Sequence, residues 1–310
     1  MEKQNRAAAV VVTYNRLELL RQCVQALRNQ SAACDILIVD NASTDGTARW
    51  LASQPELTCR NTGSNLGGAG GFNYGMRWAV EAGYDYIWVM DDDTLPQPDA
   101  LQKLLEADEV LKGSYGWLSS VVLWTDGSDC KMNRQKPKKG CQEYFPLLQY
   151  GLVQAEQATF VSLFLRAETI CRFGLPIKEF FIWGDDIEFT RRIAIRGGLP
   201  SFVAGCSQVV HATKNNVGSN VALDDTARIG RYFYAFRNEA YLYRQEGIKG
   251  RVRCTAMRCR DFLRIALHGK PKLVRFRTLL HGIWSGFFFY PKVEHIQPRN
   301  KKSSCSGRFL

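Results

Sequence analysis

The stretch YIWVMDDD, residues 86–93, places three carboxylates directly after an uninterrupted apolar run. A short apolar run of this kind is typical of a strand that is buried on both faces of a parallel sheet. Adjacent like charges repel and aspartate is a poor strand residue, so the triplet favours a functional role. Because side chains alternate along a strand, Asp91 and Asp93 would point the same way and could hold Mg²⁺ or Mn²⁺. A solvated acidic turn before Pro96 is the alternative interpretation.

The residues around this stretch alternate between apolar runs and helical spacing. We expect strands at residues 7–14, 36–40 and 84–90, and helices at residues 17–29, 72–82 and 98–110. A further helix is expected to begin in STDGTARWL, residues 43–51, with Ser43 or Thr44 as its N-cap. This order predicts an α/β fold with a Rossmann-like, mostly parallel central sheet flanked by helices, whose ligands bind beyond the carboxyl ends of the strands.

The second half of the chain is less regular. Strands are expected at residues 117–124, 158–165 and 201–211, and a helix at residues 185–196. The polar, lysine-rich segment 125–140 is expected to be a mobile loop. From residue 223 to about residue 280 the pattern is helical, without strand signals.

The positive charge of the chain is concentrated near its C-terminus. The 310 residues carry a net charge of +11, and residues 249–310 hold 15 of the 41 Lys and Arg residues but 2 of the 30 Asp and Glu residues. A nucleic-acid-binding protein is one interpretation of this basicity. The acidic predicted site loops and the confinement of the basic residues argue against nucleic acid and favour an anionic membrane surface.

Residues 251–267 predict how that surface is contacted. On a helical wheel, arginines border an apolar face formed by Val252, Ala256, Cys259, Phe262, Leu263 and Ala266. The bordering residues are Arg251 and Arg258 on one edge, and Arg253, Arg260 and Arg264 on the other. The aromatic segment IWSGFFFYPK, residues 283–292, suits the same boundary. Because no signal peptide or spanning segment is evident, we expect a cytoplasmic protein peripherally attached to the inner face of the cell membrane; packing of this helix on the rest of the protein is the alternative.

Several longer segments together resemble one family. In order, they are VVVTYNRLELLRQCVQALRNQ (10–30), ILIVDNASTDGT (36–47), NLGGAGGFNYG (65–75), YIWVMDDD (86–93), FIWGDDIEFTRR (181–192) and YFYAFRNEAYLYR (232–244). Over roughly residues 7–245 the set resembles the GT-A fold glycosyltransferases of family 2. The resemblance implies inverting transfer of a sugar from a nucleotide donor, with a divalent metal on a DxD element. We expect a GT-A catalytic domain at residues 1–222, with a nucleotide-binding half at about 1–112 and an acceptor half at about 113–222, then a helical basic region at 223–310.

The resemblance also implies roles for the residues of the donor site. Asp40 would hydrogen-bond the base, with a turn role beside Asn41 as the alternative. Asp91 and Asp93 would hold the metal and the donor, and Asp92 could meet the ribose. His211 would be a further metal ligand, although a lone histidine is more often structural. The first loop would contact the nucleotide through Thr13, Tyr14, Asn15 and Arg16.

The glycine-rich segment NLGGAGGFN, residues 65–73, leads into an expected helix. Glycine lets a backbone approach a ligand closely, and a helix N-terminus offers N–H groups to a phosphate. We therefore expect donor contacts from Asn65, Gly67, Gly68 and Gly70, with a flexible loop as the alternative. In the family, this run resembles galactofuranosyltransferases more than rhamnosyl enzymes.

The acidic pair in WGDDIEF, residues 183–189, matches the family's catalytic base. Inversion requires one carboxylate to take the proton of the acceptor hydroxyl, and we assign this role to Asp186, with Asp185 second. An N-cap role for the pair is the alternative. Trp183 is expected either to stack on the acceptor sugar or to lie in the core, and Glu188 to support the site or to lie on the surface.

The sequence thus predicts a metal-dependent, inverting hexosyltransferase of surface polysaccharide synthesis, of which O-antigen is one example. UDP-galactofuranose is the first expected donor, dTDP-rhamnose the second, and a glycan or lipid-linked glycan the acceptor, with Mn²⁺ or Mg²⁺ as cofactor. A sugar nucleotidyltransferase is disfavoured because no glycine-rich loop follows the first strand.

Overall fold

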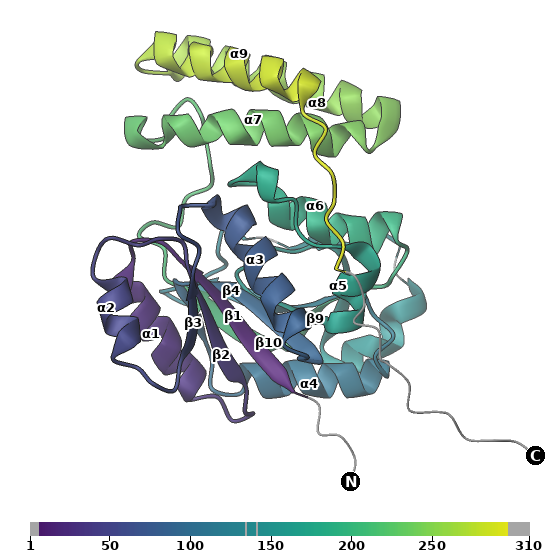
Figure 1. Cartoon of the computed structure of the whole chain (residues 1–310). Coiled ribbons are helices and arrows are strands. Elements are labelled where there is room, and N and C mark those ends of the chain that lie inside the picture. Colours follow the sequence, from purple (N-terminus) through teal and green to yellow (C-terminus); the bar gives the residue numbers. More distant parts are fainter. Residues whose placement is uncertain (1–5, 134, 141, 297–310) are drawn as a thin grey trace, which may run out of the picture.

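The computed structural model describes residues 6–133, 135–140 and 142–296. One sheet runs through the molecule in the order β3-β2-β1-β4-β9-β6-β10-β8-β7, with β5 beside β10. Helices lie on both faces of this sheet (Figure 1). The strands are β1 (Ala7–Thr13), β2 (Asp35–Asp40), β3 (Thr58–Asn61), β4 (Tyr86–Asp91), β5 (Thr94–Pro96), β6 (Leu118–Trp124), β7 (Lys136–Pro137), β8 (Leu152–Gln157), β9 (Leu163–Arg166) and β10 (Phe202–His211).

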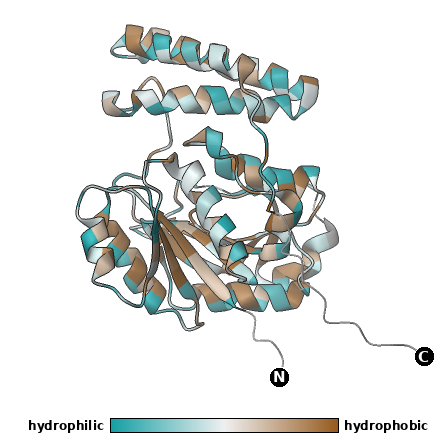
Figure 2. Ribbon diagram, in the orientation of Figure 1, coloured by the Kyte–Doolittle hydropathy of each residue, from teal (hydrophilic) through white to brown (hydrophobic). Residues whose placement is uncertain are grey.

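The first half of the sheet is parallel. Strands β3, β2, β1 and β4 pair in parallel, and every residue of β1 is buried. The side chains of β1 alternate between two cores, one under α1 (Leu17–Arg28) and α4 (Ala100–Leu111), the other under α3 (Gly67–Glu81). The hydropathy colouring shows these central strands as the most apolar part of the fold (Figure 2). The apolar runs of the sequence therefore became strands covered on both faces, and the expected α/β fold is confirmed.

Antiparallel pairs enter beyond β4. Strand β9 runs antiparallel to both β4 and β6, whereas β6 and β10 are parallel. At the far edge β10 pairs antiparallel with β8, and its carboxyl end pairs antiparallel with β5. Because β5 follows the Asp triplet directly, this last pairing brings the end of β10 back to the triplet.

Three local expectations differ from the structure. Helix α3 begins at Gly67 rather than at residue 72, and β9 begins at Leu163 rather than at residue 158. Helix α2 (Thr47–Ala52) has Gly46, with φ 95°, at its N-cap, so the prediction of Ser43 or Thr44 as the cap is wrong. Both side chains instead bind Asn15: Ser43 Oγ accepts its N–H, and Thr44 donates its N–H and hydroxyl to Asn15 Oδ1.

The segment 125–140 contains little regular structure within its described residues, namely the two-residue strand β7. Residue 134 of this segment lies outside the described residues. Its mobility therefore stays a prediction. A nine-residue 3₁₀ segment, Gln142–Tyr150, precedes β8, a strand that the sequence pattern did not predict.

The last part of the chain forms a helical layer. Short helices α5 (Ala167–Phe173) and α6 (Asp185–Arg191), a π-helical turn (Arg192–Arg196) and 3₁₀ turns (Lys178–Phe180 and Thr226–Arg228) lead to α7 (Ile229–Arg244), α8 (Gly247–His268) and α9 (Lys272–Phe288). Figure 1 shows α7, α8 and α9 stacked over α3 and α6, at the end of the sheet where β1, β2 and β4 finish. Of the helices in the described ranges, none combines the length and the apolar character required to span a bilayer.

The chain returns from α9 to the α/β part. Glu294 accepts hydrogen bonds from Arg77 and Asn73 on α3 at 2.8 and 3.3 Å, and it pairs with Lys178. Ile296 is buried in the core under α3. The helical layer is therefore tied to the sheet at both of its ends.

Candidate active site

The first loop and the Asp triplet are held together by direct hydrogen bonds. Thr13, the last residue of β1, donates its hydroxyl to Asp92 Oδ2 at 2.7 Å. Arg16 Nη1 donates to Asp93 Oδ2 at 2.7 Å and to Asp92 Oδ1 at 3.3 Å. The parallel pairing of β1 with β4 sets this contact, because it aligns the carboxyl ends of the two strands. Tyr14, between them, is 43% exposed.

The structure brings together the three residues predicted to hold a metal. Ligand atoms of Asp91, Asp93 and His211 all lie within 4.8 Å of one another. Burial and the charge of Asp93 raise the pKa of Asp91 to about 7, and burial raises that of Asp92 to about 6 against the charge of Arg16. Burial also acts on Asp93, but its bond to His211 and the charges of His211 and Arg16 hold its pKa below the ordinary value.

Both ring nitrogens of His211 face oxygen atoms. Nε2 lies 3.0 Å from Asp93 Oδ1, and Nδ1 lies 2.6 Å from Asn133 Oδ1. Burial opposes a charge on the ring, but the bond to Asp93 outweighs it and raises the pKa of His211 to about 10. A protonated ring therefore balances the carboxylates here, in the position where a divalent cation could do so.

The acidic pair at the start of α6, Asp185 and Asp186, lies within electrostatic range of the Asp triplet. Asp185 is buried, and burial, the charge of Asp186 and the charge of Asp91 raise its pKa well above the ordinary value. Asp186 is half-buried, accepts a 2.7 Å hydrogen bond from the N–H of Ile187, and has a pKa raised by burial to about 6. Because Asp91 acts electrostatically on Asp185, the two acidic clusters, far apart in sequence, share one region. At neutral pH Asp186, with its pKa of about 6, is ionised, while burial and the like charges favour the protonated form of Asp185.

Glu188 has a structural role that the sequence did not show. Its side chain is fully buried and pairs with Arg192 at 2.8 Å and with Arg196. These arginines fix α6 to the following π-helical turn, so neither a surface position nor a direct reaction role suits Glu188.

The loops that follow β1 and β2 are held by turn and side-chain hydrogen bonds. Asp40 is buried and accepts hydrogen bonds from the N–H of Ser43 at 2.9 Å and from Asn61 at 2.8 Å. Asn41 donates to the carbonyl of Gly67 at 2.8 Å. Asn15, with φ 55°, donates its N–H to Ser43 Oγ and accepts hydrogen bonds from Thr44. Asp40 thus makes turn contacts, and its contact with a base stays a prediction.

The glycines at the start of α3 are explained mainly by packing. A Cβ on Gly67, whose φ is 70°, would lie 2.1 Å from the carbonyl oxygen of Phe181, and one on Gly70 would lie 2.5 Å from Leu66. Asn65 is exposed, and its side chain accepts the N–H of Gly67 at 2.8 Å. A Cβ on Gly68 would meet no atom within 4 Å, so Gly68 has the open surroundings expected of a ligand contact.

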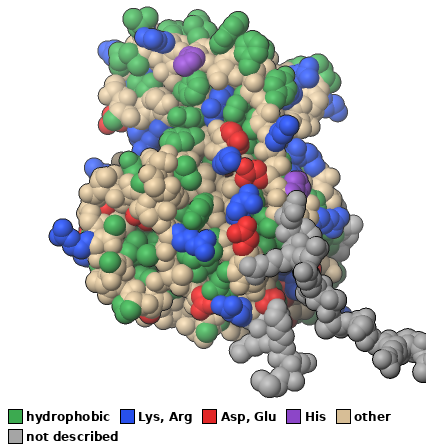
Figure 3. Space-filling model, viewed as in Figure 1, with side chains coloured by type: hydrophobic (Ala, Val, Ile, Leu, Met, Phe, Trp, Pro, Cys, Tyr) green, Lys and Arg blue, Asp and Glu red, His purple; other side chains and the backbone are tan. Residues whose placement is uncertain are grey.

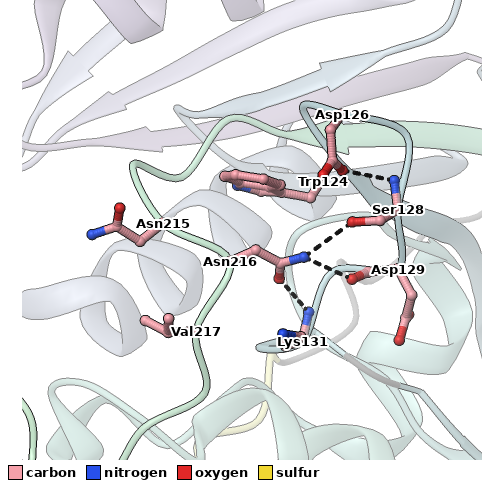
Figure 4. Close-up of a pocket in the computed structure, with 8 residues that line it drawn as sticks. All are labelled: Trp124, Asp126, Ser128, Asp129, Lys131, Asn215, Asn216 and Val217. Atoms are coloured by element: carbon pink, nitrogen blue, oxygen red, sulfur yellow. Dashed lines mark hydrogen bonds between the residues drawn. The ribbon is translucent and has the colours of Figure 1, made fainter.

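An open pocket of about 600 Å³ lies beside His211, beyond the ends of β6 and β10 (Figure 4). The pocket is lined by residues from the segments 124–131 and 215–217. The side chain of Asn216 joins these two segments through hydrogen bonds to Ser128, to the carbonyl of Asp129 and from the N–H of Lys131. Trp124 donates its ring N–H to the carbonyl of Thr213 at 2.9 Å. The polar lining and the indole make this pocket a candidate place for a sugar.

Sequence reasoning missed two residues of α7. Burial and the charges of Arg228 and Arg16 lower the pKa of Arg231, which places a further cation near the first loop. Asn238 is completely buried against the backbone just before α6. Asn238 lies within the motif YFYAFRNEAYLYR (232–244), whereas Arg231 lies just before it, and the groups that both residues act on are distant in sequence.

Comparisons with known proteins agree with this geometry. A model of the family described as glycosyl transferase family 2 matches residues 8–114. The galactofuranosyltransferase GlfT1 of Mycolicibacterium smegmatis is 30% identical over 271 residues, which cover 78% of this chain and 84% of that protein. GlfT1 of Mycobacterium tuberculosis H37Rv is 31% identical over 272 residues, covering 78% and 83%. An undecaprenyl-phosphate mannosyltransferase of Micrococcus luteus is 40% identical over 108 residues, covering 33% and 44%.

Solved structures support the fold. GalNAc-T7 in complex with UDP, GalNAc and Mn²⁺ matches with a TM-score of 0.58 and 12% identity, over 79% of this chain and 52% of that one. TarS of S. aureus matches with a TM-score of 0.51 and 12% identity, over 92% and 44%. The chain therefore spans about half the length of these structures and shares their GT-A fold.

Proposed function

The chain belongs to glycosyltransferase family 2, and on this premise we propose that it is a metal-dependent, inverting galactofuranosyltransferase that uses UDP-galactofuranose. The names of its relatives over most of its length support this donor. The observation that carries the proposal is the grouping of Asp91, Asp93 and His211, whose ligand atoms lie within 4.8 Å of one another. The charge of Asp91 also acts on Asp185, the neighbour of the proposed base. We propose a glycan or lipid-linked glycan of surface polysaccharide synthesis as the acceptor. dTDP-rhamnose is the alternative donor.

The residues present fit a divalent cation. Two carboxylates and an imidazole within 4.8 Å of one another form an oxygen-rich donor set suited to Mn²⁺ or Mg²⁺. Asp91, Asp93 and His211 would hold the ion after His211 loses its proton. When bound, the cation supplies positive charge that stabilises the departing diphosphate.

The chain's own residues bind and orient the donor in this proposal. Arg16 offers a guanidinium to the diphosphate, and Thr13 orients Asp92, the carboxylate assigned to the ribose. Asp40 retains lone pairs for the imide N–H of uracil beyond its two turn bonds. Gly68 lets the first turn of α3 approach the donor. Tyr14, which is 43% exposed, stays a proposed contact to the nucleotide, whereas Asn15, Asn65, Gly67 and Gly70 also make the contacts that shape these loops.

Asp186 performs the proton transfer in this proposal. The acceptor oxygen attacks the anomeric carbon from the face opposite the diphosphate, and the bond from that carbon to the diphosphate oxygen breaks with its electron pair leaving on oxygen. The hydroxyl proton passes to Asp186, which is ionised above pH about 6. Burial and the charge of Asp186 raise the pKa of Asp185, so the negative charge of the pair is assigned to Asp186.

A donor panel tests the proposal. The full chain is incubated with Mn²⁺, a β-galactofuranosyl or rhamnosyl acceptor and either UDP-galactofuranose, UDP-galactopyranose or dTDP-rhamnose, and product is followed by mass spectrometry. We expect transfer from UDP-galactofuranose with inversion, and no transfer from UDP-galactopyranose. Product from dTDP-rhamnose alone would replace the proposed donor by the alternative.

We further propose that α8 and α9 attach the enzyme to an anionic membrane. The predicted apolar face of α8 is exposed rather than packed on the sheet domain, with Val252 63%, Phe262 48% and Leu263 59% exposed. Arg258 differs from the prediction, because it turns inward and pairs with Glu239. Helix α9 adds exposed Leu273, Leu280, Trp284, Phe287 and Phe288. Figure 3 shows hydrophobic and basic side chains together on this layer, a combination suited to a membrane interface.

Flotation with vesicles tests the attachment. We expect the full chain to float with vesicles containing phosphatidylglycerol and to do so less when Phe287 and Phe288 are both changed to serine. A matched control changes Leu148 and Tyr150, which are similarly exposed on the catalytic domain, to serine. Equal flotation of all three proteins would refute attachment through the helical layer.

A further inference from the structure

The backbone that precedes the acidic pair is strained. Phe181 has φ 64° and Trp183 has φ 65°, a region that side-chain-bearing residues rarely adopt, and Gly184 follows with φ 87°. The N–H of Ile182 donates to the carbonyl of Phe180 at 2.7 Å, so a γ-turn of the strained, positive-φ kind is centred on Phe181. Such conformations persist only where the surroundings impose them. The residues that impose this shape therefore determine where Asp185 and Asp186 lie.

Asn238 of α7 holds this strained backbone. Its Nδ2 donates to the carbonyls of Phe180 at 3.0 Å, Ile182 at 3.1 Å and Trp183 at 2.8 Å. Backbone carbonyls only accept hydrogen bonds, so the amide nitrogen must face them and the orientation of the side chain is fixed. With no exposed surface, Asn238 has no water to replace these bonds.

Arg237 fixes Asn238 in turn. Its Nε and Nη2 both donate to Asn238 Oδ1 at 3.0 Å, and Nη2 also donates to the carbonyl of Glu179 at 2.6 Å. The guanidinium lies 4.0 Å from the centre of the Phe289 ring. From the other side, the N–H of Ala69 donates to the carbonyl of Phe181 at 3.1 Å. The loop before α6 is thus held between the glycine-rich end of α3 and the helical layer.

We propose that Asn238 is a positioning residue for the transfer reaction, which holds the carboxylate of Asp186 in place through the backbone of residues 180–183. This inference rests on the proposed function of Asp186 as the base. It gives the helical layer a role in the chemistry besides membrane attachment. Asn238 does not touch the reacting atoms, so its loss should lower turnover while leaving the donor site intact.

The test compares three variants of the full chain. Asn238→Ala removes all three carbonyl bonds. Arg237→Met keeps an unbranched apolar side chain but removes the guanidinium, with its bonds to Asn238 and to the carbonyl of Glu179 and its contact with Phe289. Arg244→Met is the matched control, because the hydrogen bonds of Arg244 go to the carbonyls of Gly286 and Phe289 at the end of α9 rather than to the carbonyls of the loop. Each variant is measured by steady-state transfer and by amide hydrogen exchange of residues 182–187.

We expect kcat to fall about 100-fold in Asn238→Ala with KM for the nucleotide sugar little changed, since misplacing a reacting group by about 1 Å has an effect of that order. Exchange of residues 182–187 should become faster in Asn238→Ala and, to a smaller extent, in Arg237→Met, but not in Arg244→Met. A folded Asn238→Ala variant with wild-type kcat, or with unchanged exchange, would overturn the inference.

Two further outcomes separate this inference from the proposed function. If Asn238→Ala does not fold, the inference is tested with Arg237→Met instead. Unchanged kcat and unchanged hydrogen exchange in Arg237→Met would then overturn the inference. If the wild-type chain transfers no sugar, the proposed function fails, while the exchange comparison still decides whether Asn238 restrains the loop.

Discussion

The Asp91–Asp93 turn and the Asp185–Asp186 pair are both acidic and largely buried, yet their neighbours differ. Arg16 and His211 bind the carboxylates of the first cluster directly. The charges that act on Asp185 come from Asp186 and Asp91 and have its own sign. Carboxylates beside cationic groups, as in the first cluster, suit the binding of a metal-bound diphosphate. Like charges without a cationic partner, as in the second cluster, favour a proton on one carboxyl of the pair and leave the other to act as a base. Similar residues thus acquire different roles from the groups around them.

Among the predicted substitutions, replacement of Asp186 by its amide should have the largest effect on transfer, and replacement of Asp185 serves as the comparison. We expect Asp186→Asn to lower transfer about 1000-fold, within the range for removal of a general base, with UDP binding retained. Asp185→Asn should have a much smaller effect, because an amide resembles the protonated acid. Initial rates and calorimetric binding of UDP with Mn²⁺ measure both. The reverse order of effects would make Asp185 the base.

The activity of the enzyme should depend on a divalent cation held by the first cluster, Asp91 to Asp93. We expect Asp93→Asn to weaken Mn²⁺ binding by at least about 100-fold, because loss of a residue that only supports a ligand can cost that much and Asp93 is a proposed ligand itself. Chelation with EDTA should stop transfer by the wild type, and added Mn²⁺ should restore it. Full activity of the chelated enzyme would contradict a metal role for this cluster.

The pH dependence should report on the second cluster. The pKa of Asp186 is raised to about 6, so lowering the pH through 6 adds a proton and removes the base. With saturating Mn²⁺ and donor, kcat should fall to about one tenth of its plateau near pH 5. The residual activity of Asp186→Asn should lack this acid limb. A wild-type kcat that is constant between pH 5 and 7 would rule out a base with this pKa.

The glycines of α3 offer the smallest expected effect. Gly67→Ala places a Cβ against the carbonyl of Phe181 in a strained backbone, so we expect a loss of about 1–3 kcal/mol in the free energy of unfolding. Gly68→Ala has open space around its Cβ and should leave the unfolding midpoint nearly unchanged. Thermal unfolding of the two variants measures this contrast. Equal destabilisation would show that Gly67 is not set by its contact with the loop before α6.

The sequence predicted the parts of the fold that depend on local pattern. Strands β1, β2 and β4 were predicted to within two residues at each end, because apolar runs between turn residues define them. Helix α3 was predicted to begin five residues late, since its glycines disfavour a helix locally and are retained for close contact with β1 and Phe181. The exposed strand β3 and the strand β8 have no comparable pattern and were missed.

The candidate site shows the same contrast between features set by local sequence pattern and features set by long-range packing. The geometry agrees with the grouping of Asp91, Asp93 and His211, because the carboxyl ends of strands meet at one edge of a sheet. The electrostatic effect of Asp91 on Asp185 and the hydrogen bond from Asn238 to the carbonyl of Trp183 depend on packing between distant segments. No spacing in one sequence encodes such contacts.

Crystals of the full chain soaked with Mn²⁺ and UDP test the central claim most directly, through an anomalous difference map at the manganese absorption edge. We expect one manganese peak contacted by Asp91, Asp93 and the diphosphate, with the carboxylate of Asp186 open to the same cavity. A peak at another place, or an Asp186 carboxylate that faces a different surface from the bound UDP, would contradict the account.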